Sequence, residues 1–186
     1  VIQFANIAIK IKPDFYKAYC NLGYMYSQRG EIDEAMRFFK KASYIRDEYP
    51  AVHHCMGNIY EKKNNYKEAI YEYNKAIKLG LDNFEIYNDI AFVYLKEKRY
   101  REAEVCLYRS LLLNNNQFGP HNNLGNLYAM FGYFDLAIEE YKKALAIDPN
   151  NKGIMKNLTR AKVGKRIIKQ KNANKSKNRW IILTYQ

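Results

Sequence analysis

The side chains that could hold a metal ion or act as nucleophiles are few in this sequence. His53, His54 and Cys55 stand in succession, and the other two cysteines, Cys20 and Cys106, lie far from them. Histidine and thiolate are common zinc ligands, but a structural zinc site needs four ligands at short spacings such as Cys-x-x-Cys. No motif supplies the remaining ligands, so we predict no metal and no cofactor. The same cysteine usage favours a reducing compartment, which we take to be the cytoplasm.

Motifs that carry catalysis are also missing from the sequence. It has no phosphate-binding loop, no Gly-x-Ser-x-Gly, no His-Glu-x-x-His and no glycine-rich dinucleotide fingerprint. Carboxylates such as Glu31, Asp33 and Glu34 stand where a helix would begin, and they stabilise the helix dipole there. We therefore predict that the chain is not an enzyme and that it acts by binding.

Asparagine is the side chain best suited to binding in this sequence. Its amide offers a donor and an acceptor together, which matches the backbone of an extended peptide. The competing explanation is that the base composition of the genome sets the frequency of Asn on a solvated surface. The predicted binding residues are Asn21, Tyr24, His54, Asn58, Asn88, Asp89, Phe92, Asn122, Asn123, Asn126 and Asn157, and Cys55, Glu61 and Lys62 share the same helix faces.

A fixed period relates these side chains to one another. The residues Asn21-Leu22-Gly23, with Tyr26 three positions later, have related residues at each step of the period. The step is about 34 residues, a length typical of a stacked array of short helical repeats. The clearest repeated positions are Gly23, Gly57, Ala91 and Gly125; Ala35, Ala69, Ala103 and Ala137; and Phe39, Tyr73, Leu107 and Tyr141.

Each repeat is predicted to contain two amphipathic helices. Leu22 and Tyr26 lie one helical turn apart, and Ala35 begins a second stripe at i, i+4 and i+7. Gly30 stands between the stripes, where the first helix should end. Small residues allow the two helices to approach closely, and large ones fill the space between repeats. One such pair cannot bury its apolar stripe alone, so neighbouring pairs must stack on it.

These positions resemble the tetratricopeptide repeat, whose signature runs from an aromatic residue through Leu-Gly, Tyr, Ala, Phe and Ala to Pro. Tyr19, His53, Tyr87 and His121 occupy the slot that holds Trp in that family, and Pro13 and Pro149 occupy the closing slot. The resemblance covers residues 1–151. It implies an all-α fold, a right-handed superhelix of stacked helix-turn-helix units whose first helices line a peptide-binding groove.

The repeat register predicts the organisation of the chain. We expect the second helix of a truncated repeat at 1–15, four repeats at 16–49, 50–83, 84–117 and 118–151, a capping helix at 152–170, and a basic, flexible tail at 171–186. Because residue 1 falls inside a predicted helix, we expect the sequence to be a fragment of a longer protein. No apolar run approaches the length of a membrane span, so we predict no membrane partner.

The positive charge belongs to the end of the chain. The net charge is +12, but residues 152–186 hold 11 of the 31 Lys and Arg and no acidic residue. The remaining 20 basic residues face 19 acidic ones, so the repeats are nearly neutral. A neutral array is not typical of nucleic-acid binding, which leaves the tail as the only candidate surface. Its two basic clusters loosely resemble a nuclear import signal, so a nuclear location stays open.

These observations favour a non-catalytic scaffold that binds a protein or peptide segment in the groove. A recognition arm of a larger enzyme is one alternative, because Asn21, Asn123 and Asn157 resemble part of the asparagine ladder of O-linked N-acetylglucosamine transferases. An RNA-associated module that uses the basic tail is the other. We reject the clamp that related repeats use for acidic C-termini, because Asp89 and Glu85 would repel a carboxylate. Oligomeric state and partner identity are not predicted.

Overall fold

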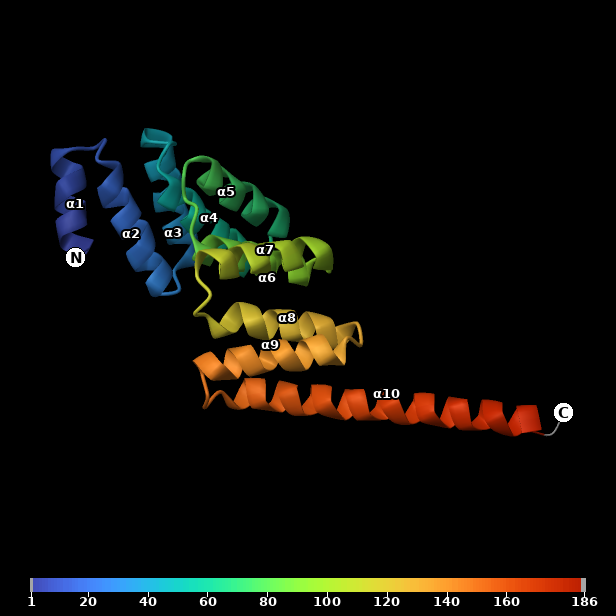
Figure 1. Ribbon diagram of the computed structural model, residues 1–186. Coiled ribbons are helices and arrows are strands. Elements are labelled where there is room, and N and C mark those ends of the chain that lie inside the picture. Colours follow the sequence, from blue (N-terminus) through green and yellow to red (C-terminus); the bar gives the residue numbers. More distant parts are fainter. Residues whose placement is uncertain (1, 185–186) are drawn as a thin grey trace. The chain divides into compact units, whose positions relative to one another are not determined.

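The computed structural model describes the backbone of residues 2–184 and the side chains of residues 2–171, and this part of the chain forms ten helices and no strand (Figure 1). The prediction of an all-α fold is confirmed. The helices are α1 (Ile2–Ile11), α2 (Tyr16–Gln28), α3 (Ile32–Ile45), α4 (Pro50–Lys62), α5 (Tyr66–Lys78), α6 (Phe84–Lys96), α7 (Tyr100–Leu113), α8 (Phe118–Met130), α9 (Phe134–Ile147) and α10 (Lys152–Thr184).

The chain folds as two compact units, residues 1–106 and residues 107–186. Unit 1 holds α1 to α6 and the first half of α7, and unit 2 holds the rest. The boundary falls inside a helix of the third repeat. The helices α2, α4, α6, α8 and α10 begin at equally spaced positions, so the period of the sequence is also the period of the structure. These positions are Tyr16, Pro50, Phe84, Phe118 and Lys152.

Stacked helix pairs bury the stripes that the period predicts. Ala35, Ala69, Ala103 and Ala137 are fully buried on the second helices. In unit 1, Tyr19, Phe39 and Met56 share one core cluster, and in unit 2, Tyr141 and Ile154 share another. Each cluster joins residues of consecutive repeats, as a solenoid of pairs requires.

The turn inside each repeat uses the left-handed backbone conformation. Gly30 and Gly132 have φ values of 77° and 79°, and Asn64 and Lys98 hold the same slot with 59° and 61°. Glycine adopts this conformation without steric cost, whereas a side chain with a Cβ is disfavoured there. Asparagine tolerates this conformation better than other residues with a Cβ, so the turn of the third repeat, with Lys98, is the most strained of the four.

Close approach of the two helices depends on a glycine that faces an aromatic ring. A Cβ added to Gly23 would lie 2.7 Å from the ring of Phe39, and one added to Gly57 would lie 2.5 Å from the ring of Tyr73. Gly125 faces Tyr141 in the same way, at 2.6 Å. Such distances leave no room for a methyl group. The third repeat carries Ala91 and Leu107 in these two slots, a larger first residue with a smaller second one.

This complementarity predicts energetic coupling between Gly23 and Phe39. Gly23→Ala alone should destabilise the chain by about 1–3 kcal/mol, because the added methyl overpacks the contact. Phe39→Leu alone should also destabilise it, because it leaves a cavity. The double variant should be more stable than the sum of the two, since Leu makes room for the methyl; urea unfolding of all four chains measures this coupling. Strictly additive effects would contradict the predicted contact.

Helix α10 closes unit 2. Ile154 and Ala161 are buried against the core that contains Ala137 and Tyr141, and Gly164 meets the ring of Phe134. The expected capping helix at 152–170 corresponds to the first part of α10. We expected a flexible tail at 171–186, but the backbone is helical as far as Thr184. The side chains after Lys171, and all of residues 185–186, lie outside the described residues.

We predict that the two parts of α10 contribute differently to stability. Removing residues 172–186 should leave the melting temperature nearly unchanged, because Lys171–Asn178 contains one apolar residue, Ala173, and separates the cap from the apolar run Trp180–Leu183. Removing residues 154–186 should lower it by several degrees, because the α9 stripe loses Ile154 and Ala161. Thermal melts followed by circular dichroism make the comparison. Equal melting temperatures for the two shortened chains would show that α10 is not a cap.

Candidate functional site

Ten of the eleven predicted binding residues lie on first helices of repeats, Asn157 lies on the capping helix α10, and none of the eleven is buried. In unit 1 they come from α2, α4 and α6, and in unit 2 from α8 and α10. The structure brings Tyr24, Asn58 and Asp89 to one hollow of unit 1, and Asn126 and Asn157 to one hollow of unit 2. The predicted residues that do not line these two hollows are Asn21, His54, Asn88, Phe92, Asn122 and Asn123.

The hollow of unit 1, which we call the acidic hollow, has a volume of about 300 Å³. Three first helices and one second helix enclose it. Its polar wall comes mainly from α4, where Glu61 and Lys62 follow Asn58 by one helical turn. The lining residues are Tyr24, Ser27, Gln28, Phe39, Cys55, Asn58, Glu61, Lys62 and Asp89.

Two side chains that do not line the acidic hollow, His54 and Tyr73, lie within hydrogen-bond distance of its carboxylates. The Nε2 of His54 lies 2.7 Å from Oδ2 of Asp89, which joins α4 to α6. The hydroxyl of Tyr73 lies 2.8 Å from Oδ1 of Asn58 and 3.0 Å from Oε2 of Glu61, and its single proton can be donated to one of them at a time. Burial raises the pKa of the Glu61 carboxyl, and the Asp89 charge adds to this effect. Burial and both carboxylates raise the pKa of Tyr73, so its hydroxyl remains a donor.

The hollow of unit 2, which we call the amide hollow, has a volume of about 310 Å³. The Nδ2 of Asn157 donates to Oδ1 of Asn122 at 3.2 Å and to Oδ1 of Asn126 at 3.1 Å. The Tyr141 hydroxyl donates to the same Asn126 oxygen at 2.7 Å. The lining residues are Asn126, Ala129, Met130, Phe134, Tyr141, Asn157, Arg160 and Ala161.

The second and fourth repeats share a polar pair that the first and third lack. Tyr73 bonds Asn58 in the second repeat, and Tyr141 bonds Asn126 in the fourth. The corresponding slots hold Tyr24 and Phe39 in the first repeat and Phe92 and Leu107 in the third. Sequence reasoning found each helix stripe but not this pairing. The sequence does contain a sign of the pairing, because Asn and Tyr occur together, 15 positions apart, in the second and fourth repeats and in neither of the others.

Two histidine–glutamate pairs, one buried and one partly buried, follow the same alternation. His53 Nδ1 lies 2.7 Å from Oε2 of Glu72, and its Nε2 lies 2.7 Å from the Asp47 carbonyl oxygen. His121 and Glu140 repeat the first contact at 2.7 Å. The position that holds an aromatic packing residue in the family therefore also makes a hydrogen bond to a glutamate of the second helix, which the sequence did not lead us to predict. With both ring nitrogens engaged, His53 has no lone pair for a metal, and the described residues contain no group of three or more ligands suited to one.

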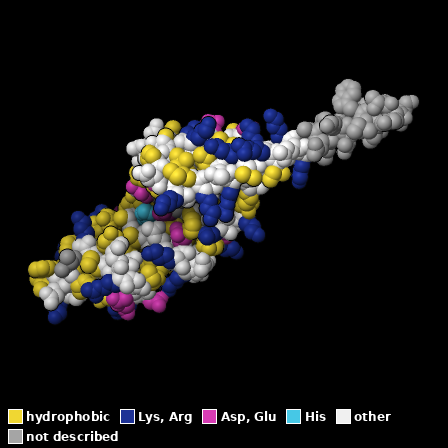
Figure 2. Space-filling view, turned by 90° about the horizontal axis from the view of Figure 1, so that it is seen from below, with side chains coloured by type: hydrophobic (Ala, Val, Ile, Leu, Met, Phe, Trp, Pro, Cys, Tyr) yellow, Lys and Arg dark blue, Asp and Glu magenta, His cyan; other side chains and the backbone are white. Residues whose placement is uncertain are grey.

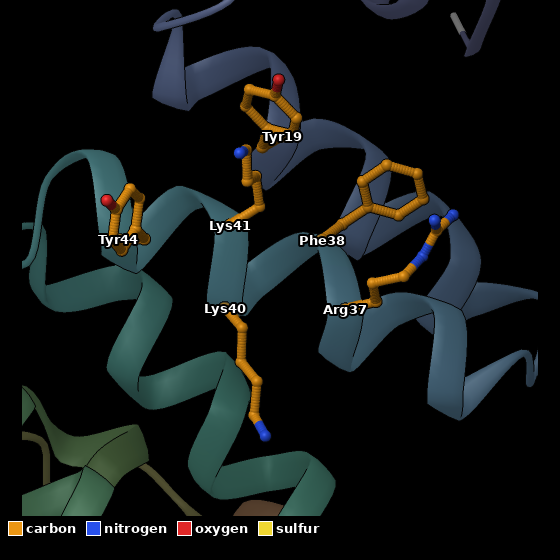
Figure 3. A pocket seen from close by; sticks show the side chains of 6 residues that line it. All are labelled: Tyr19, Arg37, Phe38, Lys40, Lys41 and Tyr44. Carbon is orange, nitrogen blue, oxygen red and sulfur yellow. The ribbon is translucent and has the colours of Figure 1, made fainter.

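A larger hollow, of about 540 Å³, lies beside α3, the second helix of the first repeat (Figure 3). Its polar groups do not converge: the Lys40 side chain points away from Lys41 and Arg37. Arg37 is paired with Glu34 at 2.7 Å, and the Tyr19 hydroxyl donates to the Pro13 carbonyl oxygen. We therefore place the candidate site at the two first-helix hollows, although this one is larger.

Basic side chains gather along the described part of α10 (Figure 2). Residues 152–171 include eight Lys and Arg and no acidic residue. Lys165 pairs with Asp135 of α9. Within the described part of the chain, no helix combines the length and apolar character needed to cross a membrane.

Helix pairs that recur at a constant step, with a glycine packed on an aromatic ring, define an α-solenoid of the tetratricopeptide type. Residues 3–118 match the C-terminal ARM domain of tetratricopeptide repeat protein 21, and residues 119–151 match the tetratricopeptide repeat. The chain therefore belongs to the tetratricopeptide repeat family. No curated protein matched the sequence significantly.

Solved structures share this fold. YrrB, described as a TPR protein with an unusual peptide-binding site, has a TM-score of 0.77 and 23% identity, over 89% of this chain and 86% of that chain. MamA from Desulfovibrio magneticus RS-1 has a TM-score of 0.75 and 24% identity, over 87% and 92%. A chain of the APC/C hetero-tetramer Cut9–Hcn1 has a TM-score of 0.77 and 23% identity, over 86% of this chain and 32% of that one.

All three thiols are partly buried, which should lower their reactivity. Burial raises the pKa of Cys20, Cys55 and Cys106 to about 11, from an ordinary value of 9.0. Because the thiolate is the reactive species, alkylation by iodoacetamide at pH 7.5 should be about 100-fold slower in the folded chain than in guanidinium. Mass spectrometry of alkylated peptides against time gives the three rates. A cysteine that reacts equally fast in both conditions would contradict the burial described here.

Proposed function

We propose that this chain is a non-catalytic scaffold that binds a peptide segment of a partner protein on the first-helix faces of its repeats. The observation that carries the proposal is the row of amides in unit 2. Asn157 is held by Asn122 and Asn126, and Asn126 is held by Tyr141, so the amides are fixed before a ligand arrives. Fixed groups lose little conformational entropy on binding.

The unused atoms of these amides suit a peptide backbone. The Oδ1 of Asn126 accepts both the Tyr141 bond and the Asn157 bond, so the Nδ2 of Asn126 takes part in neither. Likewise the Nδ2 of Asn157 donates both of its bonds, and its Oδ1 takes part in neither. A donor and an acceptor on neighbouring helices can pair with the C=O and N–H of an extended strand, and each such bond contributes roughly 0.5–1.5 kcal/mol.

Exposed apolar side chains on the same faces supply the remaining contact area. Tyr24 is 56% exposed in unit 1 and Met130 is 54% exposed in unit 2, and each lines a hollow. Large side chains at a polar site are typical of interface anchors. The likeness to YrrB, which has a peptide-binding site, supports the same class of ligand. A recognition arm of a larger enzyme would use the same contacts.

A second candidate, an RNA-associated role, is favoured by one observation. Helix α10 carries eight basic and no acidic residues between Lys152 and Lys171. Such a helix attracts phosphate without sequence preference, and the attraction falls steeply with salt. It would leave the amides of unit 2 without a function, so we rank it second.

A pair of tyrosine variants tests the proposal. Peptides selected from a random display library on the immobilised chain should lose about tenfold or more in affinity on Tyr24→Ala, because Tyr24 lines the acidic hollow. The control is Tyr44→Ala on α3, which removes an 87% exposed ring from a different face. Fluorescence polarisation measures both.

Equal affinity losses in the two variants, or selection of no peptide at all, would contradict the first-helix site. Salt-sensitive capture of RNA by a chain that selects no peptide would support the second candidate instead.

A further inference from the structure

We infer that the acidic hollow of unit 1 binds the cationic side chain of an Arg or Lys in the partner peptide, between Glu61 and Asp89. The inference rests on the proposed function and adds the chemistry of the ligand. Glu61 and Asp89 come from α4 and α6, and both line the hollow.

The two carboxylates are positioned in advance. Oδ2 of Asp89 is held by His54, and Oε2 of Glu61 lies 3.0 Å from the Tyr73 hydroxyl, whose proton it shares with Asn58. The second oxygen of each carboxylate takes no part in these bonds. A guanidinium carries five N–H donors, so one guanidinium can donate to the second oxygen of both carboxylates at once.

The local charge of the hollow is incompletely compensated. Glu61 has lost much of its hydration, which raises its pKa, and the neighbouring Asp89 acts in the same direction. The attraction of a cation between the two groups would offset both effects. The titratable groups that face them are His54 and Tyr73, which hold them, together with Lys62, Cys55 and Tyr24 in the lining.

Lys62 is the cation that a ligand must compete with. It is exposed at the edge of α4, and its charge lowers the pKa of Glu61 only as a minor effect. A flexible, solvated ammonium neutralises a carboxylate weakly. The incoming side chain would instead lie beside Tyr24, an exposed ring that lines the hollow and can attract a cation through its face.

The amide hollow serves as an internal comparison. At the positions that correspond to Glu61 and Asp89, two repeats further along the chain, the amide hollow has Ala129 and Asn157, and Arg160 also lines it. Both hollows share the Tyr–Asn pair and a similar volume. The carboxylates are therefore an addition specific to unit 1, and a cation is the ligand they would select.

Synthetic peptide pools test the inference on the full chain. Nonapeptide pools with eight random positions carry Arg, Lys, citrulline or Glu at the centre; citrulline has the shape of Arg without its charge. At low salt the immobilised chain should retain the Arg and Lys pools at least about tenfold better than the citrulline pool. Glu61→Gln should abolish this preference, since it keeps the acceptor for Tyr73 and removes the charge.

Two control variants separate local from general electrostatics. Glu85→Gln removes an exposed carboxylate of α6 that does not line the hollow, and it should leave the preference unchanged. Lys62→Met removes the competing cation and should strengthen it. Melting temperatures of all variants confirm that they fold.

The outcomes distinguish this inference from the proposed function. Equal retention of the Arg and citrulline pools would overturn the cation site and leave peptide binding intact. An equal loss of preference in Glu85→Gln and Glu61→Gln would also overturn it. Retention of no pool at all would overturn both the cation site and the proposed function.

Discussion

The contact between a glycine and an aromatic ring sets the geometry on which the other features depend. Gly23, Gly57 and Gly125 each leave room for one ring of the second helix and no more. The helices of a pair therefore approach closely, and the alanine stripe between them is fully buried. At the outer face of the first helix, Tyr73 can then reach Asn58 and Glu61 from behind. A core residue thus positions the groups of the surface.

The fold could be predicted from the sequence because one period organises it. The alanines at 35, 69, 103 and 137 mark the helix crossings whatever the neighbouring side chains do. The candidate site could be predicted only as a set of faces. Which side chains bond each other, such as His54 with Asp89, depends on rotamers and on the offset between two helices, and a period carries no information about either. The glutamates that anchor His53 and His121 were missed because they are exceptions within an apolar stripe.

The two hollows show how a repeated frame can carry different chemistry. Both are built on a Tyr–Asn pair and have nearly equal volumes, but one is lined by two carboxylates and the other by amides and Arg160. Changes at surface slots such as Glu61 and Ala129 do not disturb the buried contacts that define the repeat. This separation of core from surface is why the family fold supports a binding role without specifying the partner.

The alternation of two kinds of repeat makes the effective building block of this array two repeats long. His–Glu and Tyr–Asn pairs belong to the second and fourth repeats, and neither pair occurs at the same slots of the first and third. The cross-repeat bond of His54 to Asp89 joins one kind to the other. Shortening or lengthening the array by a single repeat would therefore place two repeats of the same kind side by side, whereas adding or removing repeats in pairs would keep the two kinds alternating. In this respect the repeating unit of the chain is a pair of repeats, and not a single pair of helices.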